Sequence, residues 1–455
     1  YIIPSSQTDF ATATKFVNSL RETGITVHRA TRDFTVAGKN YPVGSFVVLT
    51  AQSFRPHVID MFEPQVHPDV FPFPGAPPTP PYDNAGWTLA FQMGVEFDRI
   101  LDGFTGPFEK VSDWNLLAPP GRVLAAEGAV GFTTSRAVNN AYIAANRLIK
   151  SGEDVRSLSD GKLFVRSRGS TRDALARLSS ELGVSFEGTR AQPPASAPRL
   201  RAARVGLWDQ YGGSMESGWT RWILEQFEFP FERVFAPALD GGELNTRYDI
   251  LVFVNGGIPG ATVRRRPADT ATIADLPAEY REHFGRVTTE RTLPRIKEFI
   301  ENGGTVVAIG TSATNLSAYL KLPIENHLVE GGEPLPRTKL YVPGSVVSAR
   351  VDPTHPLAYG MREQTDFFFD DSPVFKNWAG AATAGVTRIA WFDSETPLRS
   401  GWAWGQKYLL NGVVAAEAKV GKGRAIFFGP EILQRAQPHG TFKLLFNAIH
   451  SSVTP

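Results

Sequence analysis

The chain has 455 residues, of which 42% are hydrophobic and 20% charged, so its apolar side chains suffice for the cores of two or three domains. Its 47 basic and 46 acidic residues give a net charge of +1, which provides no electrostatic reason to expect nucleic acid or an anionic membrane as a partner. The absence of cysteine excludes disulfides, cysteine-bound zinc and thiol catalysis, and no apolar run approaches the roughly 18 residues of a membrane span.

The first elements form a unit that recurs later in the chain. The sequence begins without Met in a strand-like run, residues 1–3, which indicates a fragment or a processed product of a longer protein. Residues 13–27 match residues 141–155 at a constant offset, each with a helical pattern that ends at a glycine before a short strand. Strand candidates precede both, at residues 1–3 and 129–132. We therefore predict two strand–helix–strand units with parallel pairing, and duplication and generic composition remain alternative origins of the match.

A proline-rich tract follows the first unit. Eight prolines lie from Pro64 to Pro81, interleaved with aromatic residues, which predicts a long extended loop. Such a loop either packs on its own domain or serves as a docking surface for a partner. Asp83 is predicted to cap a helix that carries Trp87 and Met93.

A possible metal site lies just before this tract. His57 and Asp60 are three residues apart, with His67 further on, and this spacing superficially resembles a His-x-x-Glu zinc motif. Aspartate stands in place of glutamate, and Pro56 and Pro64 argue against a regular helix that would align the ligands. The pattern favours a hydrogen-bonded loop over a zinc site.

A linker divides the chain. Residues 188–203 have linker composition, and we predict three regions: residues 1–118, an α/β unit with the proline-rich loop; residues 119–198, a second α/β unit; and residues 199–455, a larger α/β domain. The elements predicted in the larger domain are strands 205–208, 250–254 and 305–309 and helices 219–227, 293–302 and 442–451. Its insertion carries the triplet Arg264–Arg266, which is typical of a solvated loop, with a cleavage or anion site as the alternative.

A motif near the C-terminus indicates the type of this domain. Residues 425–428 predict a buried strand, and together with Gly429, Pro430 and Glu431 they resemble the Phe-His-Pro-Glu motif of class I glutamine amidotransferases. The resemblance implies a flavodoxin-like domain in which the His is the general base, the Glu orients it and a Cys is the nucleophile. Here Gly429 replaces the base and cysteine is absent, so the usual chemistry cannot occur.

A serine could replace the missing nucleophile. Residues 308–314 predict a strand that runs into a tight turn and a helix, which is the setting of a nucleophile elbow, with Ser312 at the reactive position. His439 is the best remaining base. A hydrolase that uses this pair is therefore an alternative, although the pattern favours a purely structural turn.

The loop after strand 205–208 predicts a ligand crevice. It lies at the carboxyl end of a strand in an open α/β sheet, where ligands bind, although it carries no G-x-G-x-x-G fingerprint. We predict Tyr211, Ser214, Trp219 and Arg221 as binding residues for an anion or a sugar. A small-ligand-binding module is thus a third alternative.

The chain resembles the C-terminal region of large bacterial proteins of the zinc carboxypeptidase (carboxypeptidase A-like) family. The resemblance is carried by residues 41–48, 55–65, 81–95, 211–222 and 435–446. It implies a secreted or periplasmic protein in which a zinc peptidase domain, with His-x-x-Glu and a distant His as ligands, precedes this region. No ligand maps onto this chain, because the residue three after His57 is Asp60, so zinc is implied only for the upstream domain and no cofactor is expected here.

We therefore predict a non-catalytic accessory region without a membrane span or a nucleic-acid partner. Its partner would be the peptidase domain of the same precursor or another protein chain, and a peptide or glycan is the predicted ligand.

Overall fold

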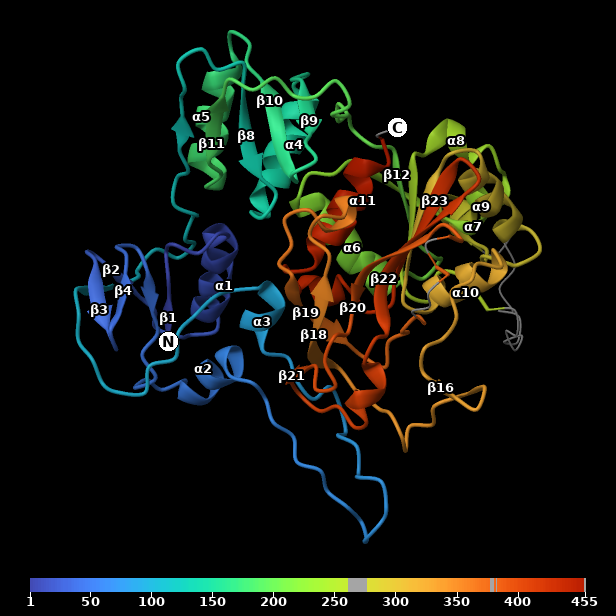
Figure 1. Cartoon of the computed structure of the whole chain (residues 1–455), viewed down its shortest axis with the longest axis horizontal. Helices are drawn as coiled ribbons and strands as arrows, with labels where there is room; N and C mark the ends of the chain where they lie inside the picture. The colour runs from blue at the N-terminus through green and yellow to red at the C-terminus, as the bar shows by residue number, and fades with distance from the viewer. Residues whose placement is uncertain (261–275, 377–379, 382, 454–455) are drawn as a thin grey trace.

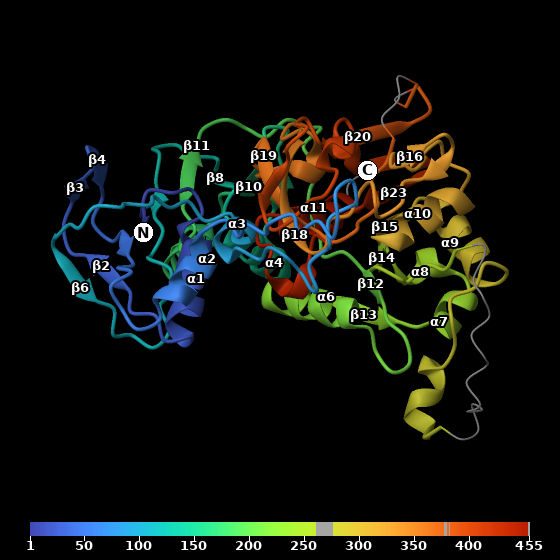
Figure 2. The ribbon, with the colours of Figure 1, turned by 90° about the horizontal axis from the view of Figure 1, so that it is seen from below.

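The computed structural model describes residues 1–260, 276–376, 380–381 and 383–453. Their three main sheets have four, five and ten strands, and Figure 1 shows each sheet with its own helices. In the second view, the N-terminal strands lie at one end of the molecule and the strands β14 (Ile250–Phe253) and β15 (Thr305–Ile309) lie toward the other (Figure 2). The arginine triplet Arg264–Arg266 lies outside the described residues.

The first unit contains a split strand–helix–strand arrangement. Its elements are β1 (Ile2–Ile3), α1 (Phe10–Glu22), β2 (His28–Ala30), β3 (Phe34–Val36), β4 (Lys39–Tyr41), β5 (Phe46–Val47) and β6 (Phe108–Lys110). The sheet order is β1-β5-β2-β6, and β5 pairs antiparallel with both β1 and β2. The strands β1 and β2 therefore run parallel to each other without being neighbours.

The second unit repeats this arrangement. Its elements are β7 (Val123–Leu124), β8 (Gly131–Ser135), α4 (Asn140–Lys150), β9 (Val155–Ser157), β10 (Lys162–Arg166), α5 (Thr171–Leu182) and β11 (Phe186–Thr189). Here β10 lies between β8 and β9 and is antiparallel to both. The predicted direct parallel pairing was wrong in both units, because a third strand takes up the inner hydrogen-bonding edges of the two parallel strands.

The segment between the units corrects two further predictions. Helix α2 (Arg55–Phe62) is regular where a loop was predicted, because Pro56 lies in its first turn, where a missing N–H breaks no helical hydrogen bond. The predicted helix capped by Asp83 is shorter than expected: α3 (Leu89–Met93) follows Thr88, and Asp83 instead accepts a hydrogen bond from the next backbone N–H.

The proline-rich tract is an extended excursion that returns to the large sheet (Figure 1). At its start, Gln65 accepts a hydrogen bond of 2.7 Å from the Gly401 N–H, and at its end Gly86 donates one of 3.1 Å to the Gly344 carbonyl. Between these anchors, Phe73 is 64% exposed and Tyr82 is fully exposed. The tract is therefore held at both ends and leaves aromatic rings exposed to solvent between its anchors.

The large domain has a flavodoxin-like core. Its parallel strands are β12 (Val205–Trp208), β13 (Phe231–Val234), β14, β15 and β23 (Gly423–Phe428). They lie in the order β13-β12-β14-β15-β23, which is the order 2-1-3-4-5 of doubly wound flavodoxin-like folds. The helices are α6 (Met215–Gln226), α7 (Ala236–Asp240), α8 (Leu244–Arg247), α9 (Thr292–Glu301), α10 (Thr311–Tyr319) and α11 (Phe442–Ser451).

An antiparallel extension continues the same sheet beyond β23. It consists of β18 (Ser345–Val351), β19 (Gln364–Phe369), β20 (Val386–Trp391), β21 (Leu398–Ser400) and β22 (Val413–Val420). Helix α6 begins four residues before its predicted start at Trp219, because Ser214 caps it by accepting a hydrogen bond from the Ser217 N–H.

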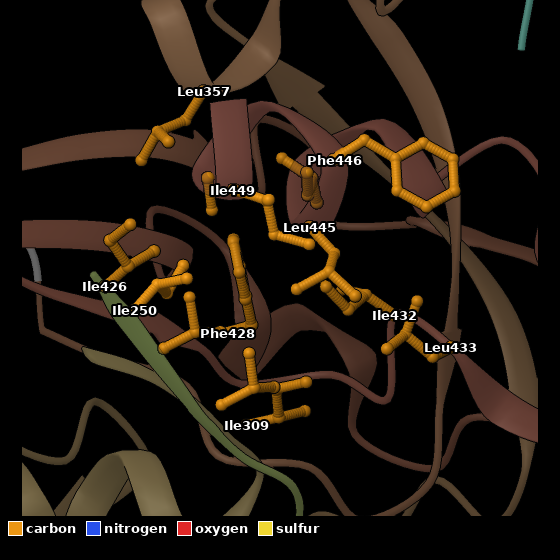
Figure 3. Packing of buried hydrophobic residues seen from close by; sticks show 14 of the residues in the cluster. Ile250, Ile309, Leu357, Ile426, Phe428, Ile432, Leu433, Leu445, Phe446 and Ile449 are labelled. Carbon is orange, nitrogen blue, oxygen red and sulfur yellow. The ribbon is translucent and has the colours of Figure 1, made fainter. Parts of the chain in front are cut away.

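Helix α11 joins the large sheet to the second unit. Figure 3 shows Leu445 and Ile449 of α11 beside Phe428 of β23 in the main core. On the other side of the helix, the ring of Tyr142 from α4 lies 5.1 Å from that of Phe446, and all five side chains belong to one buried cluster. The second unit and the large domain therefore share a core.

A buried polar network connects all three sheets. The Asn139 side chain accepts a hydrogen bond of 2.7 Å from Lys443 Nζ and donates one of 3.0 Å to the His439 carbonyl, while its backbone N–H donates to Asp9. Burial lowers the pKa of Lys443. None of the described helices combines the length and apolar character that crossing a bilayer requires.

Candidate functional site

A cavity of about 670 Å³ lies where the parallel strands end. Its walls come from the starts of α6 and α10, from the segments after β14 and β23, and from the loop after β19. Ligands of open α/β sheets bind at this edge, because the carboxyl ends of the strands and the helix starts converge there. Its polar and aromatic lining includes Glu216, Trp219, Asn255, Thr311, Asp370 and Glu431.

The turn between β15 and α10 has the geometry of a nucleophile elbow, with Gly310 at its apex. Gly310 adopts φ 61° and ψ −133°, a conformation that strains residues other than glycine. A β-carbon at this position would lie 2.6 Å from Asn255 Oδ1, which is too close for a carbon atom. The strained position is therefore Gly310 rather than Ser312, and it has no side chain that could react.

The two candidate catalytic residues have other partners. Ser312 is fully buried, and its Oγ donates a hydrogen bond of 2.6 Å to the Val254 carbonyl and accepts one of 2.9 Å from the Ile258 N–H. His439 Nδ1 lies 2.9 Å from the Gln437 carbonyl, and burial lowers the pKa of His439 to about 4. No hydrogen bond among the described residues joins Ser312 to His439, because Ser312 closes the turn after β14 and His439 packs at the start of α11.

Gly429, at the position that corresponds to the general base, also has no room for a side chain. A β-carbon on Gly429 would overlap the carbonyl oxygen of Pro373. The Gly429 N–H also donates a hydrogen bond of 2.9 Å to the Val414 carbonyl, which holds this backbone in place. A histidine therefore cannot be accommodated here unless the neighbouring loop moves.

Glu431 is the glutamate of the segment that resembles the amidotransferase motif. Burial raises the pKa of Glu431 to about 7, and the nearby carboxylates of Glu216 and Asp370 raise it further, against a hydrogen bond from Asn255. Asn255 Oδ1 accepts hydrogen bonds from the Thr311 N–H (2.9 Å) and Oγ1 (2.7 Å), so its amide N–H groups are left for Glu431. At neutral pH, Glu431 can thus both donate and accept hydrogen bonds.

The cavity is acidic overall. Glu216, Asp370, Asp371 and Glu431 line it, against the single basic residue Arg435 among the described lining residues. The Arg435 guanidinium lies 4.5 Å from the ring centre of a neighbouring tryptophan rather than against a carboxylate. Asp371 and Arg435 have φ values of 44° and 49°, so strained backbone occurs at this rim, as is common at ligand sites. Such a cavity disfavours anionic ligands.

The structure places one of the four predicted binding residues in the cavity. Trp219 lines it. Tyr211 packs edge-on against two aromatic rings of the distant segment between β14 and α9. Ser214 caps α6, and Arg221 forms an ion pair of 2.8 Å along the exposed face of α6. The local pattern indicated the sheet edge at which the cavity lies but could not orient these side chains.

Sequence reasoning missed Glu216, Asn255 and Asp370. The position of Asn255 could have been predicted, because it directly follows the predicted buried strand 250–254 and must lie at the same sheet edge as residue 310. Asp370 follows an antiparallel strand far along the chain, and no pattern in the sequence relates it to the crevice.

The candidate metal ligands have other roles. His57 Nε2 lies 3.0 Å from Thr23 Oγ1, and His67 Nδ1 lies 3.4 Å from the Pro68 carbonyl. His57 and Asp60 line a separate cavity of about 380 Å³ beside α2, and His67 does not line it. Within the described residues, no group of three or more His, Asp or Glu side chains could hold a metal ion.

Comparison with known proteins gives only distant similarities. No family model and no curated protein matches the chain. Among solved structures, a cytoplasmic protein from Salmonella typhimurium is 14% identical over 54% of this chain and 97% of that chain, with a TM-score of 0.32. A ThuA-like protein from Bacteroides uniformis is 12% identical over 58% of this chain and 96% of that one, with a TM-score of 0.35. A β-galactosidase from Bacillus circulans is 11% identical over 55% of this chain and 31% of that one, with a TM-score of 0.33. The fold assignment therefore rests on the strand order of this chain itself.

The raised pKa of Glu431 predicts a pH-dependent stability. Its pKa is about 7 in the folded chain against a normal 4.5, so the folded state binds the proton more tightly and loses stability as the pH rises through this window. Relative to the wild type, a Glu431→Gln variant should gain about 2 kcal/mol more in unfolding free energy at pH 8 than at pH 5. Urea unfolding at both pH values measures this difference. Glu298→Gln, on the exposed face of α9, is the control and should show no such change. Equal effects of Glu431→Gln at both pH values would contradict the assignment.

The elbow geometry predicts that Gly310 cannot be replaced without loss of stability. Gly310→Ala should destabilise the protein by about 1–3 kcal/mol, because alanine is strained at this φ and its β-carbon would crowd Asn255. Gly218→Ala in the first turn of α6 meets open space and should instead stabilise the protein by about 0.5–1 kcal/mol. Thermal and urea unfolding of the two variants provide the comparison. A Gly310→Ala variant as stable as the wild type would rule out the strained elbow.

Proposed function

We propose that this chain is a non-catalytic binding region whose crevice binds a small hydroxyl-rich ligand of the glycan class. The observation that supports the proposal most directly is an open polar cavity beside two positions at which a reactive side chain would not fit. Gly310 and Gly429 have no room for a nucleophile or a base, yet about 670 Å³ lies between them. This volume is typical of a site for a small molecule.

The lining groups support a glycan as the ligand. Carboxylates accept hydrogen bonds from hydroxyl groups, and the side-chain amides of Asn84 and Gln434 supply both donors and acceptors. Trp219 adds a flat apolar face on which a sugar ring can pack. A peptide amino group could also pair with the carboxylates, but it would use neither the amides nor the indole face.

We further propose that this region acts as an accessory part of a secreted or periplasmic carboxypeptidase-like protein. The support is the sequence resemblance of five segments that span nearly the whole chain. The exposed rings of Phe73, within the proline-rich tract, and Tyr82, just after it, are available for docking on a peptidase domain or another chain.

The glycan proposal predicts a specific dependence on Trp219. We expect the wild-type chain to bind at least one sugar from a panel of neutral mono- and disaccharides, measured by ligand-observed NMR and then calorimetry. Trp219→Ala should weaken this binding at least tenfold, which corresponds to about 1.4 kcal/mol. Trp222→Ala is the matched control, because Trp222 lies on the same helix, is 49% exposed and does not line the cavity. Binding that survives Trp219→Ala would reject the site, and binding only of peptides with a free amino terminus would reject the glycan class.

The accessory role predicts the composition of the native protein. Intact mass and N-terminal sequencing of material from the native source should give a longer chain that carries an upstream His-x-x-Glu, or a peptidase that co-purifies with this region. A native protein that begins at Tyr1 without an associated peptidase would reject the accessory role and leave the glycan proposal untouched.

A further inference from the structure

A second cavity lies between the second unit and the C-terminal helix. It measures about 220 Å³ and shares no lining residue with the crevice. Its walls include Arg136 after β8, Ser157 of β9, and His450 of α11. Exposed residues, Ser159 and Ser196, form part of its lining, so the cavity connects to solvent.

The cavity contains a buried positive charge without a carboxylate partner. Arg136 is only 3% exposed and forms no ion pair with any described residue. Its Nη1 donates a hydrogen bond of 3.1 Å to the Gly161 carbonyl and its Nη2 donates one of 3.0 Å to Ser157 Oγ, while its Nε has no partner among the described residues. A guanidinium stays protonated even when burial lowers its pKa, so this charge is desolvated and uncompensated.

The neighbouring groups offer only partial compensation. The Arg136 guanidinium lies 5.6 Å from the ring centre of Tyr359, a cation–π contact that is much weaker than a buried ion pair. Asp160 acts on Arg136 only through its more distant charge. Buried charges in proteins are normally paired, so the missing partner must come from outside the described residues.

Two further groups in the same cavity have unused hydrogen-bonding capacity. Ser157 Oγ accepts from Arg136, and its own O–H has no acceptor within the described part of the chain. His450 Nδ1 is buried and has no partner there either. Burial lowers the pKa of His450 to about 3, so its ring is neutral, and its Nε2 lies 3.2 Å from Asn146 Oδ1. Since that oxygen is an acceptor, Nε2 carries the proton and Nδ1 is left as an acceptor.

We propose that this cavity binds a small oxyanion, with the Arg136 guanidinium as its charge partner and the Ser157 hydroxyl as a second donor. His450 contributes to the wall of the cavity from the side of α11. The cavity is smaller than the roughly 300–1,000 Å³ of sites for drug-sized ligands, which matches a single phosphate or carboxylate group. Because its walls come from both sides of the junction, the bound anion holds α11 against the second unit.

The experiment measures the melting temperature of the full chain during titration with inorganic phosphate and, separately, with acetate. Chloride keeps the ionic strength constant, and calorimetry measures the binding directly. Because the anion binds only the folded state, we expect a saturable rise of about 2–4 °C. A rise with phosphate assigns a phosphate-type site, a rise with acetate alone assigns a carboxylate-type site, and both results support the oxyanion.

Variants link the effect to Arg136. Arg136→Gln should abolish the saturable rise in melting temperature. Ser157→Ala removes only one hydroxyl and should weaken anion binding at least tenfold. The second variant tests the site even if the Arg136→Gln protein does not fold. Arg166→Gln is the matched control, since Arg166 lies on the adjacent strand, pairs with Asp154 and does not line the cavity. The proposal is overturned if neither anion differs from chloride, or if the response survives in the Ser157→Ala and Arg136→Gln variants.

Discussion

The crevice depends on one side-chain amide, that of Asn255. Its oxygen accepts hydrogen bonds from the Thr311 N–H and hydroxyl, which satisfies a backbone donor at the start of α10 that would otherwise have no partner. This leaves its N–H groups to Glu431. The same amide lies so close to Gly310 that no β-carbon fits there. The geometry of the elbow and the lack of room for a side chain at Gly310 are therefore consequences of one contact, whereas burial raises the pKa of Glu431 against the hydrogen bond from Asn255.

The cavity does not depend on reactive side chains, because the sheet topology creates it. Four neighbouring parallel strands end at one edge, and the segments that follow them form a concave wall regardless of which side chains they carry. In this chain the wall is acidic, and the rim includes Asp371 and Arg435 with positive φ. Strained backbone of this kind persists only where the surrounding packing enforces it, which supports a rigid cavity suited to binding.

The three sheets are not independent domains joined only by linkers, because contacts of α11 and Asn139 connect them. Tyr142 of the second unit packs on Phe446 of α11, and Asn139 binds Lys443 while its N–H reaches Asp9 of the first unit. These contacts bury polar and charged groups that need partners. The cavity around Arg136 lies on the same junction, so a ligand there would act on the packing of two units at once.

The sequence by itself determined the features that local patterns encode. The predicted strand 305–309 coincides with β15, because an apolar run between glycines favours a buried strand on its local pattern alone. The absence of a general base at residue 429 follows from the identity of that residue, since glycine has no side chain. Tertiary structure alone decided that a third strand enters each strand–helix–strand unit, and that Gly310 rather than Ser312 is the strained residue of the elbow. Strand pairing, backbone strain and the convergence of acidic side chains depend on contacts between residues distant in the chain. These contacts cannot be predicted from the periodicity of a single segment.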